Sequence, residues 1–334
     1  MISDSLLEYA SAQYDFDKGI LRFVAEGNYT AKQFYSFEKN HETYILRFAK
    51  NPVDDAGQAV SADIAGQAII EMDWLSFLAD NGISVPRPLK TADGDYTISA
   101  WADGEAFIIA AYSKMKGRLF NVNDPGLWNE KIFYNWGRVM GDMHRVTKSY
   151  KPARGIERRS SVNDIISDNV MLFPSVNKIA EELIDEITAL PQDNDSFGMV
   201  HSDLGPTNFL IDGDTINVFD FEDCRYEWFA QDIGAALTFA IWFGRYNDAG
   251  YDFSNDIFKN FLAGYHSAYQ LDDFWLSKIP LFLRLYQIAG FAYANRAVDP
   301  SDDMQKEGIY NIENNILFTG CNIDYSLFKL SLRA

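Results

Sequence analysis

The chain has 334 residues, of which 47% are hydrophobic and 15% aromatic, which excludes an intrinsically disordered protein and predicts a large core. Its length favours two lobes over one. The 48 acidic residues outnumber the 29 basic ones and give a formal net charge of −19, which disfavours nucleic acid and anionic membranes as partners. This acidity would suit a cationic substrate, although acidic surfaces more commonly serve solubility.

The cysteines and the apolar stretches indicate the cellular compartment. Only two cysteines occur, Cys224 and Cys321, and neither belongs to a Cys-x-x-Cys motif or a Cys/His cluster, so a zinc site is excluded and a reducing compartment is indicated. The first residues, MISDSLLEYA, lack the basic and apolar regions of a secretory signal peptide. The longest apolar stretch, residues 233–244, is too short to span a bilayer, so we expect a cytoplasmic protein.

The amino-terminal part of the chain predicts a small antiparallel sheet with helices. The periodicity of apolar residues indicates, in chain order, a helix at 5–14, three strands within 19–48, a helix at 64–81 and a strand at 96–101. The two prolines of VPRP, before the last of these strands, require extended backbone. We place the lobe boundary at the turn formed by Asp103 and Gly104, which predicts lobes of residues 1–101 and 102–334.

Beyond this turn the pattern is mostly helical. Apolar residues at helical spacing predict helices at 128–147, 162–171, 176–190, 233–244, 256–269, 275–297 and 306–318. Residues 196–222 differ, because short apolar runs alternate there with turn-forming residues. The basic segment 151–161 could contact phosphate, but a solvated loop explains it better.

Residues 200–223 read VHSDLGPTNFLIDGDTINVFDFED and contain the side chains that phosphoryl transfer requires. The reaction needs a carboxylate near the attacking hydroxyl and oxygen ligands for Mg²⁺. Asp203, Asn208 and Asp220 supply these groups in close order. Each alone would be a turn, cap or strand-edge residue, but their shared order, spacing and apolar surroundings favour a catalytic site.

The same stretch resembles a known family. HSDLGPTN resembles the catalytic loop of the kinase-like phosphotransferases, and INVFDFED resembles their metal-binding strand and turn. Glu222, two residues after Asp220, and the downstream Asp-Ile-Gly resemble the aminoglycoside phosphotransferase and choline kinase family. This resemblance implies an α+β, protein-kinase-like bilobal fold, with a small antiparallel-sheet lobe and a larger, mostly helical lobe.

The resemblance also implies roles for individual residues. Asp203 would orient the acceptor hydroxyl or accept its proton, Asn208 and Asp220 would bind Mg²⁺, and two further residues would brace the loop, namely His201 and Asp232. On the residues alone, we interpret His201 as a packed loop anchor, and His144 as a core histidine.

Residues upstream of the motif agree with a nucleotide site. Arg47, on the third predicted strand, and Glu71, on the following helix, stand where kinases pair a basic residue with a carboxylate to position the phosphates of ATP. The turn at Gly27 and Asn28 resembles phosphate-binding turns, although an ordinary hairpin explains it equally well. By resemblance, the backbone from Ala100 to Ala102 would contact adenine as the hinge.

These observations predict an ATP- and Mg²⁺-dependent phosphotransferase that acts on a hydroxyl of a small molecule. Aromatic and acidic stretches at 221–229, 242–246 and 275–293 are candidate walls of the acceptor site and would suit an amine, although aromatic residues at helical spacing more often form a core. A nucleotide-binding pseudokinase is an alternative. A protein Ser/Thr kinase is disfavoured because no Ala-Pro-Glu segment or long activation loop separates Asp220 from Asp232.

Overall fold

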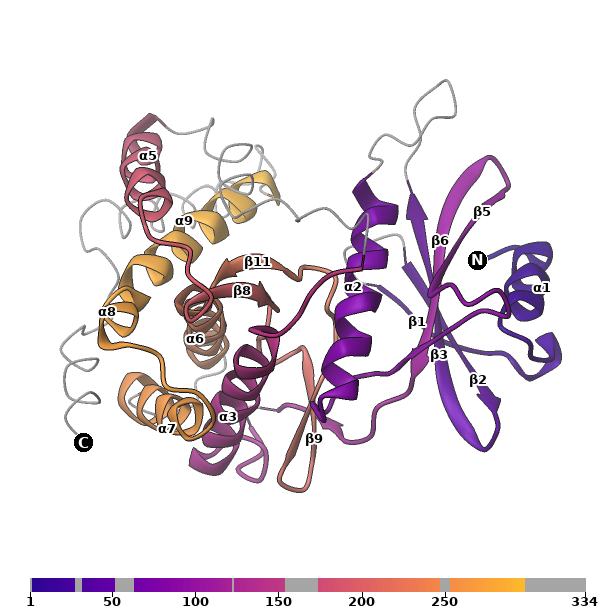
Figure 1. Cartoon of the computed structure of the whole chain (residues 1–334), viewed down its shortest axis with the longest axis horizontal. Helices are drawn as coiled ribbons and strands as arrows, with labels where there is room; N and C mark the ends of the chain where they lie inside the picture. Colours follow the sequence, from indigo (N-terminus) through magenta and orange to yellow (C-terminus); the bar gives the residue numbers. More distant parts are fainter. Residues whose placement is uncertain are drawn as a thin grey trace. The chain divides into compact units, whose positions relative to one another are not determined.

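The computed structural model of the chain describes residues 2–27, 32–51, 63–121, 123–153, 174–246 and 253–297 (Figure 1). The chain divides into two compact units. The first comprises Met1–Gly117, Tyr150–Glu157 and Asn217–Glu222, and the second comprises Arg118–Ser149, Arg158–Ile216 and Asp223–Ala334. None of the helices in the described ranges is both long and apolar enough to cross a membrane.

A six-stranded sheet forms the centre of the first unit. Its strands are β1 (Arg22–Glu26), β2 (Lys32–Lys39), β3 (Glu42–Asn51), β4 (Pro88–Leu89), β5 (Thr97–Ala102) and β6 (Glu105–Ser113). The spatial order is β1-β2-β3-β6-β4, with β5 also paired to β6, and the pairs are antiparallel. The predicted meander of three strands is therefore confirmed as β1, β2 and β3.

Two helices lie on opposite faces of this sheet (Figure 1). Helix α1 (Asp4–Gln13) packs on the face that carries Leu46 and Phe48 of β3. Because side chains alternate along a strand, Arg47 points to the other face, where it meets helix α2 (Asp63–Asp80). Both helices occur within one residue of their predicted bounds.

The predicted lobe boundary is wrong. Asp103 and Gly104 form the turn between β5 and β6, which pair in register from Thr97↔Ala110 to Ala102↔Glu105. The turn therefore joins two strands of one sheet, and the first unit continues to Gly117. The sequence signal misled because a turn between paired strands and a turn between domains contain the same residue types.

The second unit is mostly helical, with short strands around the catalytic motif. Its elements are β7 (Arg118–Leu119), α3 (Glu130–Thr147), α5 (Pro174–Thr188), β8 (Phe197–Val200), β9 (Phe209–Asp212), β10 (Thr215–Val218), β11 (Arg225–Trp228), α6 (Phe229–Tyr246), α7 (Phe253–Ala268), α8 (Asp273–Leu276) and α9 (Ile279–Ala297). The last two residues of β10 belong to the first unit. The strands form two small sheets, β10-β9-β7 and β11-β8.

Helices α3 and α7 approach each other closely at two glycines. A Cβ atom on Gly137 would lie 1.9 Å from the carbonyl oxygen of Phe261, and one on Gly264 would lie 1.8 Å from that of Tyr134. Only glycine fits at these positions, because any side chain would overlap the backbone of the other helix. This crossing brings His144 of α3 into contact with Tyr265 of α7.

The predicted helices agree with α3, α5, α6 and α7, with one difference further along the chain. The single helix predicted at 275–297 is divided into α8 and α9. Pro280 lies in the first turn of α9, where its missing N–H does no harm, whereas inside a continuous helix it would remove a hydrogen bond. The helices predicted at 162–171 and 306–318, and most of the basic segment 151–161, lie outside the described residues.

Candidate active site

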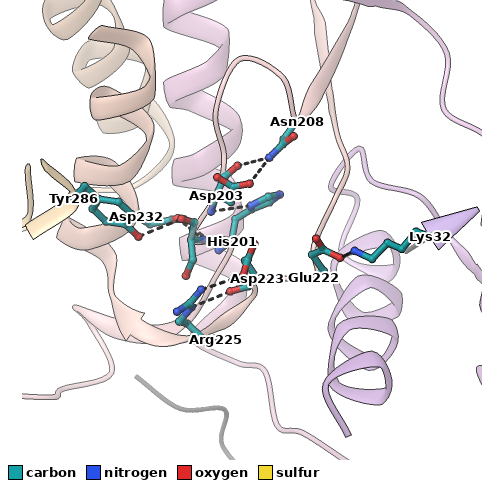
Figure 2. A network of polar contacts seen from close by, with 10 residues as sticks. Lys32, His201, Asp203, Asn208, Glu222, Asp223, Arg225, Asp232 and Tyr286 are labelled. Carbon is teal, nitrogen blue, oxygen red and sulfur yellow. Dashed lines mark hydrogen bonds and ion pairs between the residues drawn. The ribbon is translucent and has the colours of Figure 1, made fainter. Parts of the chain in front are cut away.

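The catalytic motif forms a loop between β8 and β9 in the second unit. The amide Nδ2 of Asn208 donates hydrogen bonds to both the carbonyl oxygen and Oδ2 of Asp203, each at 2.7 Å (Figure 2). The backbone N–H of Asp203 donates to Nδ1 of His201 at 3.2 Å. These contacts fix the orientation of the Asp203 carboxylate. Both hydrogen bonds from Asn208 use its amide nitrogen, so neither of them involves its oxygen, Oδ1.

Asp232 of α6 supports this loop from inside the protein. Its Oδ1 accepts a hydrogen bond from the N–H of Ser202 at 2.7 Å, and its Oδ2 accepts one from the N–H of His201 at 3.4 Å. His144 Nε2 lies 3.0 Å from the same Oδ2, and His144 Nδ1 lies 2.8 Å from the hydroxyl of Tyr265. Four of these side chains are completely buried, namely those of His144, His201, Asp232 and Tyr265.

The pKa of Asp232 agrees with its role as an acceptor for the backbone of this loop. Burial alone would raise the pKa of its carboxyl group. The hydrogen bond and charge of His144, the charge of His201 and the N–H of Ser202 together outweigh burial and lower the pKa. Asp232 is therefore an ionised acceptor for the loop, and the interpretation of His144 as a core histidine agrees with its burial.

Two backbone positions in the motif adopt the left-handed region. Ser202 has φ of 68° and Asp220 has φ of 65°, a conformation that residues with a side chain seldom adopt. The hydroxyl of Tyr286, on α9, donates to the carbonyl oxygen of Ser202 at 3.1 Å, so this strained residue is held by Asp232 on its N–H and by Tyr286 on its carbonyl (Figure 2). Tyr286 lies within residues 275–293, which were predicted only as a candidate wall of the acceptor site. No local signal in the sequence connects it to a loop 84 residues away.

Asp220 belongs to the first unit and lies two residues beyond Val218, the last residue of β10. The strand is fixed at Asn217, whose Nδ2 donates to the carbonyl oxygen of Lys116 at 2.8 Å and whose Oδ1 accepts from the hydroxyl of Ser84 at 2.5 Å. After Asp220, the ring of Phe221 is buried edge-on against Trp74, with centroids 5.4 Å apart. The carboxylate of Asp220 is thus exposed between anchored neighbours.

Arg47 and Glu71 form the ion pair that the sequence predicted. Nη1 of Arg47 donates to Oε1 of Glu71 at 2.8 Å, and Nη2 donates to Oε2 at 2.7 Å. Both residues are buried. Burial alone would lower the pKa of Arg47, but the charge and hydrogen bonds of Glu71 raise it, and the charges of Tyr112 and Asp220 add to the increase.

A second ion pair in the first unit was not predicted. Lys32, the first residue of β2, pairs with Glu222 (Figure 2). The sequence analysis noted Glu222 for its place in the motif but gave no reason to connect it with Lys32. No spacing rule covers two side chains so far apart in the chain.

The remaining predicted nucleotide contacts have different outcomes. The N–H of Gly27 donates to the carbonyl oxygen of Lys32 at 3.0 Å, which closes the β1–β2 hairpin, and Asn28 lies outside the described residues. Ala100 and Ala102 lie within β5, opposite Phe107 and Glu105 of β6, and their side chains pack against the core under α1. The hinge prediction for these two alanines is therefore wrong, because the chain leaves the first unit only after β6, at Gly117.

The predicted site residues thus form two groups. The second unit brings together His201, Asp203, Asn208 and Asp232, and the first unit contains Gly27, Arg47, Glu71, Ala100, Ala102 and Asp220. The oxygen donors fit Mg²⁺, which takes few carboxylates together with phosphates and water. Asn208 fits because its nitrogen is occupied by Asp203 and its oxygen is the remaining donor atom.

Comparison with known proteins identifies the relatives of this chain. Residues 23–275 match the model of the phosphotransferase enzyme family. The chain is 31% identical to amicoumacin kinase of Bacillus subtilis (strain 168) over 309 residues, which are 89% of this chain and 86% of that protein.

Solved structures extend the comparison to the fold. An amicoumacin kinase in complex with AMP-PNP, Ca²⁺ and Ami superimposes with a TM-score of 0.82 at 26% identity and covers 99% of this chain and 97% of its own. A microcompartment-associated aminopropanol kinase has a TM-score of 0.69 at 19% identity, with 96% and 100% covered, which shows a shared fold. The protein-kinase-like α+β fold is therefore confirmed, and the chain belongs to the phosphotransferase enzyme family.

Proposed function

We propose that this chain is an ATP- and Mg²⁺-dependent kinase that phosphorylates a hydroxyl group of an amine-bearing small molecule. The observation that carries the proposal is the double hydrogen bond from Asn208 to Asp203, which holds a carboxylate in a fixed orientation on a loop braced by Asp232. The family membership and the identity to amicoumacin kinase support the reaction class. A kinase that uses ATP is expected in the cytoplasm.

In this reaction the oxygen of the acceptor hydroxyl forms a bond to the γ-phosphorus of ATP. The bond between that phosphorus and the oxygen bridging it to the β-phosphate breaks, ADP leaves, and the hydroxyl proton passes to the carboxylate of Asp203. Asp203 also orients the hydroxyl before transfer, and this positioning accounts for much of the catalysis in phosphoryl transfer. The Asn208 contacts keep the carboxylate from rotating away from the acceptor.

Asn208, through Oδ1, and Asp220, through its carboxylate, would hold Mg²⁺. The ion, when bound, neutralises charge that develops on the phosphates. Arg47 supplies positive charge toward the phosphates, and Glu71 fixes its guanidinium. For adenine we propose the backbone of residues 114–117, which follows β6, in place of Ala100 and Ala102.

The proposed amine on the acceptor follows from the charge of the protein. The net charge of −19 raises the local concentration of cations at the protein surface. This charge favours a cationic acceptor over an anionic one.

The test is ATP turnover by the purified chain with Mg²⁺ and a panel of amino alcohols, aminoglycosides, homoserine-like compounds and sugars. ADP release and the mass of the phosphorylated product identify the acceptor. Replacing Asp203 by Asn is expected to lower kcat by about 10² to 10⁴-fold, because the base is lost while the shape is kept. Calorimetry should show that Asp203→Asn binds ATP as the parent does.

Two outcomes would contradict the proposal. The first is an Asp203→Asn enzyme that phosphorylates the responding acceptor as fast as the parent. The second is nucleotide binding that does not depend on Mg²⁺, together with no transfer to any acceptor, which would indicate a nucleotide-binding regulatory module instead.

A further inference from the structure

The ion pair between Lys32 and Glu222 joins the β1–β2 hairpin to the segment that contains Asp220, the proposed Mg²⁺ ligand. Lys32 is the first residue of β2, and its own carbonyl oxygen accepts the hydrogen bond from the N–H of Gly27 that closes the hairpin. Glu222 follows Asp220, the proposed Mg²⁺ ligand, by two residues. A cation on the hairpin is thereby held by a carboxylate of the metal-binding segment (Figure 2).

The Arg47–Glu71 and Lys32–Glu222 ion pairs of this unit differ in how easily their partners can be exchanged. The side chains of Arg47 and Glu71 are 7% and 5% exposed, whereas those of Lys32 and Glu222 are 14% and 33% exposed. Separating a buried pair leaves charges without solvent, but a partly exposed pair can be replaced by water or by another ligand at low cost. Lys32 also has a flexible stem and three donor hydrogens, whereas the guanidinium of Arg47 is a rigid fork.

Two of the five N–H donors of Arg47 are already committed to Glu71. Its two terminal nitrogens each donate to one oxygen of Glu71, and Nε is buried without a hydrogen-bond partner. A nucleoside triphosphate brings several negative charges to a unit in which Asp220 and Glu222 already contribute carboxylates. A further cation that can move toward the phosphates would compensate this repulsion.

We propose that Lys32 is a second phosphate-binding cation and that Glu222 holds it until the triphosphate of a nucleotide arrives. On binding, the ammonium group exchanges the carboxylate of Glu222 for phosphate oxygens. This inference rests on the proposed function and adds to it a residue of β2 and a carboxylate that competes with the nucleotide for that residue.

The exchange predicts effects of opposite sign for the two partners. Lys32→Met should raise the Kd for ATP about tenfold, because one charge-assisted contact to phosphate is lost. Glu222→Gln should lower that Kd several-fold, because the competing carboxylate is removed. A pair that only stabilised the fold would change affinity in the same direction in both variants.

The measurement is calorimetry with ATP, ADP and adenosine, each titrated once with saturating Mg²⁺ and once with EDTA, so that any ligand role of Glu222 toward a divalent cation appears as a difference between the two series. The Lys32 effect should occur with ATP and ADP and disappear with adenosine. Lys32→Arg should restore most of the affinity, and the double variant should bind like Lys32→Met. The matched control is Lys50→Met, which removes an exposed lysine paired with Glu105 at 2.6 Å in the same unit and should leave the Kd unchanged.

Equal weakening of ATP binding by Lys32→Met and Glu222→Gln, or an unchanged Kd in both, would overturn the inference. Thermal unfolding of each variant identifies a loss of folding, and the sign for Glu222→Gln still decides the question if Lys32→Met proves unstable. If the expected Kd changes occur but no acceptor is phosphorylated, the proposed function fails and this inference stands. If Asp203→Asn abolishes transfer while the Lys32 variants bind ATP as the parent does, the proposed function stands and this inference fails.

Discussion

The catalytic loop of the second unit and the ion pairs of the first unit hold charged groups in different ways. Around the loop, Asp232 accepts hydrogen bonds from two backbone N–H groups and contacts one buried histidine. In the first unit, Arg47 and Lys32 are each held by a carboxylate side chain. Buried partners, whether backbone N–H groups or the carboxylate of Glu71, fix a geometry that must not change, whereas the partly exposed carboxylate of Glu222 allows Lys32 to respond to a ligand.

Removing Asp232 is expected to have the largest effect. Asp232→Ala leaves the N–H groups of His201 and Ser202 and the ring of His144 without their buried acceptor. We expect the free energy of unfolding to fall by an amount toward the upper end of about 3–5 kcal/mol, because two buried N–H groups and a buried histidine lose the carboxylate that they contact. Urea unfolding monitored by fluorescence measures this change.

A matched control for this prediction is Asp195→Ala in the same unit. The carboxylate of Asp195 is mostly exposed and pairs with Lys148. Its removal should change the free energy of unfolding by less than about 1 kcal/mol. Similar losses in the two variants would show that the backbone acceptor role of Asp232 does not stabilise the loop.

The lowered pKa of Asp232 predicts a pH dependence of stability. Because its pKa is lower in the folded protein than in the unfolded chain, the unfolded chain binds the proton first as pH falls. The stabilisation is complete above about pH 4, the ordinary value for Asp, and is lost as pH falls further toward the folded pKa. Relative to Asp232→Asn, the parent should lose stability more steeply in this range, by at most about 1.4 kcal/mol per pH unit. Parallel curves from urea unfolding across the acidic range would refute this assignment.

Breaking the ion pair between Arg47 and Glu71 is expected to lower the free energy of unfolding somewhat less. Glu71→Ala leaves the buried guanidinium of Arg47 without a counter-charge, and we expect the free energy of unfolding to fall by about 3 kcal/mol, at the lower end for a buried pair. The KM for ATP should rise as well, because Arg47 loses the carboxylate that orients it. Urea unfolding and steady-state kinetics measure the two effects.

The control for Glu71 is Glu105→Ala, which removes a carboxylate that is 46% exposed and whose lysine partner is 43% exposed. Its effect on both quantities should be small, since exposed ion pairs contribute little. Equal effects of the two variants would mean that burial does not distinguish these pairs.

The sequence predicted those parts of the site that depend on local order. The interval from Asp203 to Asn208 is short enough for a single loop, so order and spacing helped to predict that both belong to one site, and the structure shows the two side chains in contact. Arg47 and Glu71 were predicted because the resemblance implies a basic residue on the third strand and a carboxylate on the helix that follows it. In both cases the signal is carried by consecutive elements, which the periodicity of apolar residues reveals.

The contacts that the sequence missed depend on pairing between distant segments. The hinge was placed at Ala100 and Ala102 because nothing local shows that β5 turns back to pair with β6. The contact of Tyr286 with Ser202, like that of Lys32 with Glu222, arises only after the chain has folded. Strand order and tertiary side-chain pairs are therefore the information that sequence patterns lack.

The smallest prediction concerns Tyr286. Tyr286→Phe keeps the ring and removes the hydroxyl that donates to the carbonyl oxygen of Ser202. We expect a loss of about 1 kcal/mol in the free energy of unfolding, typical of one hydrogen bond. Because Ser202 precedes Asp203 and has a left-handed backbone, a less constrained carbonyl should also let Asp203 move and lower kcat.

Tyr269→Phe separates these two effects. The hydroxyl of Tyr269 donates to the carbonyl oxygen of Asp195 at 2.7 Å in the same unit, at a position that does not touch the loop. Its removal should cost a similar amount of stability and leave kcat unchanged. If both variants lower kcat equally, the effect reflects general stability, but if only Tyr286→Phe does so, the second backbone anchor of Ser202 contributes to holding Asp203 for phosphoryl transfer.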